Sequence, residues 1–119
     1  NVEFVGEVTD EKKDKLMAGA KAFVFASEDE DFGIIPVEAM MAGTPVIAHR
    51  SGGVLETVVE GKTGVFFDEL TVESLNSTIK KFDDSNHRIK SEDCIKHAQK
   101  FSRERFEKEI EEFVNSKVK

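Results

Sequence analysis

The 119-residue sequence predicts an α/β fold in which helices flank both faces of a parallel sheet. Short apolar runs alternate along the chain with helix-forming segments, as expected for successive βα units. After the runs at 22–26 and 45–48, a glycine-containing loop leads into a helix. No internal repeat, low-complexity segment or flexible linker interrupts this alternation. We therefore interpret residues 1–119 as a single domain.

The expected elements follow in order along the chain. Strands are predicted at 2–6, 22–26, 45–48 and in the segment ending at residue 67, four in all. The run at 22–26 is uninterruptedly apolar, which is typical of a strand buried on both faces. Helices are predicted at 10–20, with Leu16 and Met17 towards the core, and at 33–42, 53–59, 71–82 and 91–101. Ser102 is expected to cap a separate last helix.

Composition limits the classes of partner. The net charge of −7 argues against nucleic acid and anionic membrane surfaces, because both bind clustered Lys and Arg. Cys94 is the single cysteine, so no internal disulfide can form, and the three histidines lack metal-ligand spacing. No apolar run approaches the roughly 18 residues of a membrane span. We expect a cytoplasmic protein with no metal and no cofactor.

The stretch 27–45 carries the candidate site. A helix is expected to open near Gly33, directly after a strand, and to stop at Gly43. In open α/β sheets, ligands bind where a loop at the carboxyl end of a strand enters a helix. Gly33 allows close approach to the backbone, and the free amides of Ile34 and Ile35 favour an anion. This arrangement predicts a phosphate site.

Acidic residues flank the predicted phosphate site, with Glu28 to Asp31 before the helix and Glu38 inside it. Carboxylates repel phosphate, but they accept hydrogen bonds from sugar and ribose hydroxyls. One carboxylate on each side can therefore hold the two ends of a nucleotide sugar around its pyrophosphate. The alternative is that these are ordinary solvated surface acids.

Glu30 and Glu38, separated by seven residues in Glu-Asp-Phe-Gly-Ile-Ile-Pro-Val-Glu-Ala-Met, closely resemble the E-x7-E signature of retaining glycosyltransferases with the two-domain GT-B fold. That group includes sucrose-phosphate and glycogen synthases and many mannosyltransferases. The resemblance implies that Glu30 contacts the donor sugar at the catalytic centre. It also implies that Gly33 to Ile35 meet the phosphates and that Glu38 binds ribose hydroxyls.

A second loop repeats the same layout of strand, glycines and helix start. Gly52, Gly53 and Glu56 resemble the G-G-x-x-E element that lines the donor side of the cleft in that group. Without the resemblance, two adjacent glycines more often mark an ordinary turn. The following segment 60–67 resembles another element of the group, but we expect it to act mainly as a turn before an edge-side strand.

The resemblance covers roughly residues 2–115, which correspond to the later part of the Rossmann-like, donor-binding C-terminal domain of a GT-B enzyme. It implies retention of configuration, with the leaving phosphate assisting as the base. The upstream Arg and Lys that neutralise the donor pyrophosphate, and the N-terminal acceptor domain, lie outside this sequence. The isolated chain is therefore expected to be inactive.

The sequence resembles mannosyltransferases of cell-surface polysaccharide or lipid-linked sugar assembly most closely. The expected donor is GDP-mannose, with a UDP-sugar as the alternative, and the parent enzyme is expected in the cytoplasm or peripherally at the inner face of the membrane. The segment itself is expected to make no membrane contact.

Three other classes remain open from the residues alone. A glycoside hydrolase also uses two carboxylates, but it does not account for the glycine and helix start between them. A phosphoacceptor receiver domain has this size and acidity, yet Glu7 and Asp10 are spaced loosely and a fifth strand is lacking. A non-catalytic module, binding carbohydrate or nucleotide, is the third; the carbohydrate version lacks the Trp and Tyr that stack on sugars.

Overall fold

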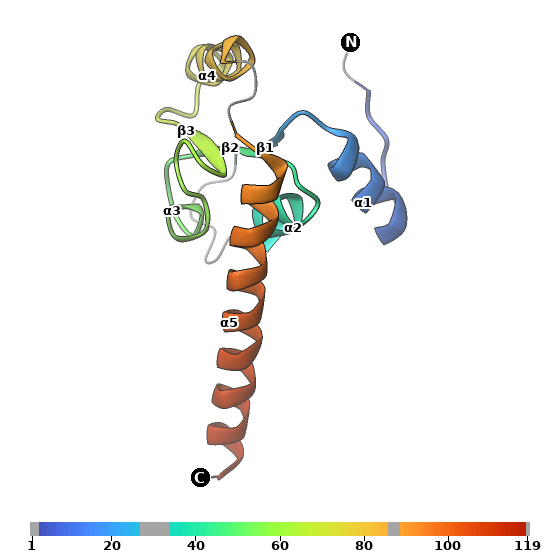
Figure 1. The fold of residues 1–119 in the computed structure, drawn as a ribbon, viewed down its shortest axis with the longest axis vertical. Coiled ribbons are helices and arrows are strands. Elements are labelled where there is room, and N and C mark those ends of the chain that lie inside the picture. The colour runs from blue at the N-terminus through green and yellow to red at the C-terminus, as the bar shows by residue number, and fades with distance from the viewer. Residues whose placement is uncertain (1–2, 27–33, 86–88, 119) are drawn as a thin grey trace.

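The computed structural model describes residues 3–26, 34–85 and 89–118, and its centre is a three-stranded parallel sheet (Figure 1). The strands are β1 (Phe23–Phe25), β2 (Val46–His49) and β3 (Gly64–Phe67), in that spatial order. Phe23 aligns with Val46, and Val46 aligns with Gly64. The sheet is parallel because a helix connects each strand to the next. The predicted α/β class is confirmed.

Helices lie on both faces of this sheet, as the alternation along β2 shows. Val46 and Ala48 join the larger core with residues of α1 (Asp10–Gly19), α2 (Ile34–Met41), α3 (Val54–Thr57) and α5 (Ser91–Val118). Ile47 points the other way and packs with Phe67 and with Phe82 of α4 (Val72–Asp84). All three β2 residues are at most 2% exposed, so β2 is the buried centre of the fold.

Two expectations about strands are wrong. Residues 3–6 form no strand: they do not pair with the open edge of β1, and no core covers their side chains, since Phe4 is 94% exposed. The strand at 22–26 exists as β1, but it is not buried on both faces, since Val24 is 42% exposed. β1 is an edge strand, and α4 packs on β3 at the opposite edge.

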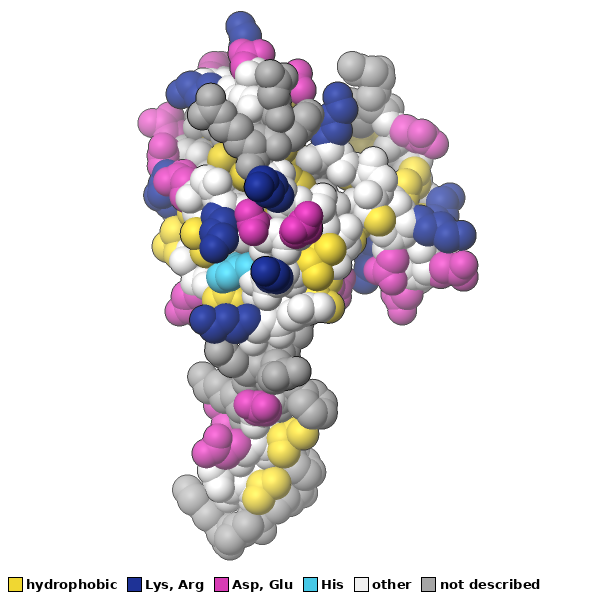
Figure 2. Space-filling view, in the orientation of Figure 1, with side chains coloured by type: hydrophobic (Ala, Val, Ile, Leu, Met, Phe, Trp, Pro, Cys, Tyr) yellow, Lys and Arg dark blue, Asp and Glu magenta, His cyan; other side chains and the backbone are white. Residues whose placement is uncertain are grey.

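Two expectations about helices are also wrong. Leu16 is exposed, and only its neighbour Met17 is buried, because adjacent helical residues point about 100° apart. Ser102 does not start a new helix: α5 is continuous over 28 residues, since no Gly or Pro interrupts it. Its C-terminal half projects from the body of the molecule (Figure 1), and hydrophobic side chains are exposed on this part (Figure 2). Ile110 and Val114, which belong to this half of α5, are about half exposed.

Several helix boundaries lie at or within one or two residues of the predicted ones. Thr9 caps α1, its hydroxyl accepting the Lys12 N–H at 3.2 Å, and Thr71 caps α4 in the same way. Gly43 follows α2 at a φ of 83°, the left-handed conformation that ends many helices. Within the described ranges, no helix has the length and apolar character that crossing a membrane requires.

Candidate functional site

The predicted phosphate site lies where α2 begins, at the carboxyl edge of the sheet. α2 starts at Ile34, soon after β1 ends at Phe25, and Pro36 lies buried in its first turn. First-turn N–H groups have no acceptor inside their own helix, so the amides of Ile34 and Ile35 suit an anion there. Glu30 and Gly33 lie outside the described residues.

Glu38 lies one turn into α2 and is already engaged by a cation. Its Oε2 accepts a hydrogen bond from Lys13 Nζ of α1 at 2.9 Å, and the two side chains are 40% and 38% exposed. The Asp10 carboxylate lies 4.0 Å from the same ammonium. The hydrogen bond to Glu38 raises the pKa of Lys13 above its ordinary value, so this side chain carries a full positive charge at neutral pH.

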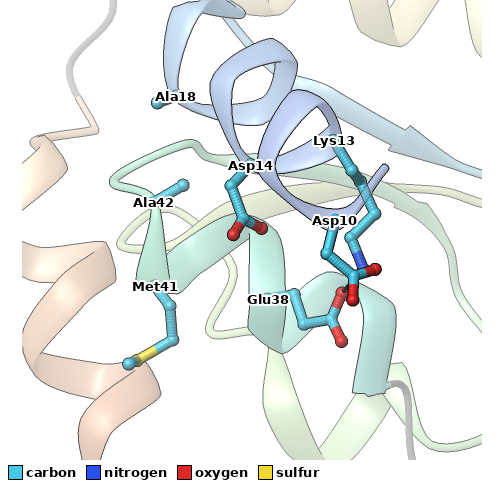
Figure 3. Close-up of a pocket in the computed structure, with 7 residues that line it drawn as sticks. All are labelled: Asp10, Lys13, Asp14, Ala18, Glu38, Met41 and Ala42. Carbon is cyan, nitrogen blue, oxygen red and sulfur yellow. Dashed lines mark hydrogen bonds and ion pairs between the residues drawn. The ribbon is translucent and has the colours of Figure 1, made fainter. Parts of the chain in front are cut away.

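An open groove of about 820 Å³ separates α1 and α2 around this ion pair (Figure 3). Asp10, Lys13 and Asp14 line it from α1, and Glu38 and Met41 line it from α2. Because Lys13 faces Glu38 and Ala18 shares the far part of the groove with Ala42, the two helices run in the same direction. The ion pair therefore lies towards their N-terminal ends, where the carboxyl edge of the sheet is located.

The second predicted loop reaches the same edge of the sheet. Gly52 has a φ of 64° and is exposed, so glycine suits this position for its backbone conformation. Gly53 is buried in a right-handed helical conformation as the N-cap residue of α3. Glu56 is exposed on α3, and α3 contacts α2. The structure thus brings the described residues of both predicted loops to one edge, while their roles stay predictions.

Arg50 lies directly after β2, at the start of the second loop, and two acids bind its guanidinium. Its Nε donates to Asp68 at 2.7 Å and its Nη2 donates to Glu60 at 3.0 Å. The guanidinium also lies 4.9 Å from the centre of the Phe66 ring. These contacts tie the end of β2 to the segments flanking β3, so they fix the frame of the loop and do not leave the charge free for a ligand.

Sequence reasoning missed both cations. Lys13 lies in the run Lys12-Lys13-Asp14-Lys15, in which no single residue stands out. One signal was available: Lys13 is four residues before Met17, which was assigned to the core, and residues four apart share a helix face. For Arg50 the only signal in the sequence was its position two residues before Gly52.

The chemistry offered by this edge is binding through hydroxyl-accepting carboxylates and helix-start amides. Across residues 3–26, 34–85 and 89–118, no three His, Cys, Asp or Glu side chains come together as a metal site would require. The Cys94 thiol is buried, and burial raises its pKa to about 11, so it is protonated at neutral pH. The described residues therefore fit a recognition site for a phosphorylated, hydroxyl-rich ligand.

An α/β domain with helix starts and acids at one sheet edge occurs in many protein families, and sequence comparison identifies the family of this chain. The family model described as "Glycosyl transferases group 1" matches residues 1–101. The chain belongs to this family, which removes the receiver and hydrolase interpretations.

The curated relatives include several mannosyltransferases. The chain is 48% identical over 61 residues to the alpha-1,3/1,6-mannosyltransferase alg-2 of Neurospora crassa, covering 51% of this chain and 13% of that protein. It is 30% identical to ALG2 of Yarrowia lipolytica, covering 94% of this chain and 25% of that protein. The chain thus spans a quarter or less of the length of these two relatives.

Two solved structures have the same fold as this chain. Sucrose-phosphate synthase of Thermosynechococcus elongatus superposes with a TM-score of 0.75 at 28% identity, over 82% of this chain and 25% of that one. Anabaena Alr3699/HepE in complex with UDP and glucose gives a TM-score of 0.70 at 27% identity, over 96% of this chain and 32% of that one. Sucrose-phosphate synthase is in the GT-B group that residues 30–40 resemble.

Proposed function

We propose that this chain supplies half of the donor-binding site of a retaining glycosyltransferase of the GT-B type. The enzyme moves mannose from GDP-mannose to a glycan or lipid-linked acceptor in cell-surface polysaccharide synthesis, in the cytoplasm. The observation that carries the proposal is Glu38, which stands at the carboxyl edge of the sheet one turn after the helix-start amides of Ile34 and Ile35. Family membership and the mannosyltransferase names of the relatives support it.

The residues act on the donor in distinct ways under this proposal. Glu30 positions the donor sugar, the amides of Gly33 to Ile35 bind the diphosphate, and Glu38 binds the ribose hydroxyls. Gly52, Gly53 and Glu56 line the other side of the donor. As the sugar leaves, negative charge develops on the diphosphate, and the fixed dipoles at the start of α2 stabilise it.

The chain alone is expected to bind the donor weakly and to turn it over little or not at all. The cationic pair and the acceptor domain that the GT-B resemblance implies are not among its residues. Arg50 does not replace that pair, because its guanidinium is bonded to Asp68 and Glu60. Full activity requires the N-terminal domain of the same polypeptide.

A UDP-sugar is the alternative donor, and one observation favours it. The similar HepE structures are complexes with UDP, UDP and glucose, or UDP-glucose. The mannosyltransferase relatives match at higher identity, up to 48%, and on that ground GDP-mannose is the first choice.

Two isosteric substitutions test the proposed roles. Glu38→Gln removes a charge-assisted bond to a ribose hydroxyl and should weaken GDP binding by about 1.5–3 kcal/mol. Glu30→Gln should lower the affinity for GDP-mannose and leave the affinity for plain GDP unchanged. Binding is measured by NMR titration of the isotope-labelled 119-residue chain. Glu73→Gln is the matched control, because Glu73 is an exposed acid on α4, which covers the other face of the sheet.

The result can contradict each role separately. Unchanged GDP affinity in Glu38→Gln removes the ribose role of Glu38. An equal loss of GDP and GDP-mannose in Glu30→Gln removes the sugar role of Glu30. A loss in Glu73→Gln of the same size as in Glu38→Gln would show that the effect is one of net charge alone.

A further inference from the structure

The contact between Lys13 and Glu38 joins two helices at the proposed donor site. Lys13 lies 25 residues before Glu38, and its ammonium donates to Glu38 Oε2 at 2.9 Å (Figure 3). Asp10 and Asp14 also line the groove, so three acids among the described residues surround this ammonium. The ammonium bonds to the one acid that lies on the opposite helix.

Lys13 is held in place by the packing of α1. Met17, one turn further along the same face, is buried in the larger core. Its carbonyl accepts a hydrogen bond from the Thr44 hydroxyl, which comes from the segment between α2 and β2. The backbone of α1 is thus attached to the residues that follow α2. This attachment holds the Lys13 side chain next to Glu38.

This contact determines which part of the Glu38 carboxylate is available to a ligand. Oε2 accepts a hydrogen bond from Lys13, and no side chain among the described residues bonds Oε1, so Oε1 is the better acceptor for a hydroxyl group. A half-exposed glutamate without a partner samples several rotamers, and a ligand must then immobilise it at an entropic cost. A carboxylate that is already fixed avoids much of that cost.

We propose that Lys13 is a positioning residue, which holds the Glu38 carboxylate in the orientation that accepts a ribose hydroxyl of the nucleotide donor. The inference rests on the proposed function, because it assumes the ribose role of Glu38. Lys13 acts through Glu38 and does not itself touch the donor. A surface ion pair of no functional consequence would affect ligand binding only through its charge.

A comparison of two ligands separates positioning from charge. GDP carries both ribose hydroxyls, whereas 2′,3′-dideoxy-GDP carries neither, and the two have the same diphosphate charge. If only the charge of Lys13 matters, its loss lowers the affinity for both ligands equally. If Lys13 positions Glu38, its loss lowers the affinity for GDP alone. The NMR titration is carried out on the 119-residue chain at one fixed ionic strength.

Three variants are compared with the wild type. Lys13→Met keeps the length of the side chain and removes its charge and its hydrogen-bond donors. It should lower the affinity for GDP about three- to tenfold and change the affinity for dideoxy-GDP less than about twofold. Lys13→Arg keeps a charged donor and should recover GDP affinity to within about threefold. Lys15→Met is the control, because Lys15 lies on the same helix and pairs with Glu11 at 3.5 Å, away from Glu38.

The outcomes are distinguishable. Equal losses of GDP and dideoxy-GDP in Lys13→Met, or the same losses in Lys15→Met, overturn the inference in favour of a charge effect. Unchanged GDP affinity in Lys13→Met, together with a loss in Glu38→Gln, overturns the inference and leaves the proposed function intact. If the wild type binds GDP and dideoxy-GDP equally, the ribose role itself fails and the inference fails with it.

Discussion

A single methyl group added at Gly64 should destabilise the sheet. Gly64 is buried at the start of β3, directly opposite Val46 of β2. A Cβ at Gly64 would lie 2.2 Å from the Val46 carbonyl oxygen and 2.8 Å from a methyl carbon of Val58. The usual distance from a carbon to a carbonyl oxygen is about 3.3 Å, so β2 and β3 would have to separate by about 1 Å.

The cost of Gly64→Ala follows from that separation. Overpacking of a dense core costs about 1–3 kcal/mol. The movement also stretches the backbone hydrogen bond between the two strands beside the contact, from Val46 N–H to Thr63 C=O at 3.1 Å. A weakened bond of this kind costs about 1 kcal/mol. We expect a loss of about 2–4 kcal/mol, a large part of the stability of a domain this size.

Urea unfolding followed by far-UV circular dichroism measures this loss, because the chain contains no Trp or Tyr for fluorescence. Gly19→Ala is the control: Gly19 ends α1, and an added Cβ meets nothing within 4 Å. Alanine there should be neutral or should stabilise the chain by up to about 1 kcal/mol. A Gly64→Ala variant within about 1 kcal/mol of the wild type would refute the reasoning.

Two further predictions concern buried groups. The Cys94 thiol, whose pKa rises from 9.0 to about 11 through burial, favours the folded state only while protonated. Its contribution is therefore complete below pH 9.0 and is lost as the pH rises through about 11, so the urea midpoint should fall more steeply over this range in the wild type than in Cys94→Ala. Equal slopes would contradict the assignment. Thr44→Val removes the hydrogen bond from the Thr44 hydroxyl to the Met17 carbonyl. Because the Ala20 N–H also reaches that carbonyl at 3.2 Å, the urea-measured loss should be only about 1 kcal/mol, and a loss above about 3 kcal/mol would refute this estimate.

The sequence contained enough to place the α/β fold and most helix boundaries, because local signals decide them. Thr9, Thr71 and Gly43 act as caps through their own side chain or backbone. Burial was harder to predict, because it depends on what lies next to an element. The apolar run at Val24 looks like a central strand, and its exposure follows only from the position of β1 at the sheet edge.

The candidate site also combines features that the local sequence encodes with contacts that only the fold creates. The helix start at Ile34 and the glycine turn at Gly52 are encoded within a few residues, so a sequence reading finds them. The partner of Glu38 is a lysine 25 residues earlier, and only the packing of α1 on α2 brings the two together. Contacts between elements of this kind need the fold before they can be recognised.

The central claim is that the edge formed by the starts of α2 and α3 binds a nucleoside diphosphate. The most direct test is an NMR titration of the labelled chain with GDP, UDP, ADP and GDP-mannose at millimolar concentration. The account predicts that amides at residues 33–38 and 52–56 shift together and that one base is preferred, with GDP expected. Shifts confined to α4 or to the projecting part of α5, or no shift with any of the four, would contradict it.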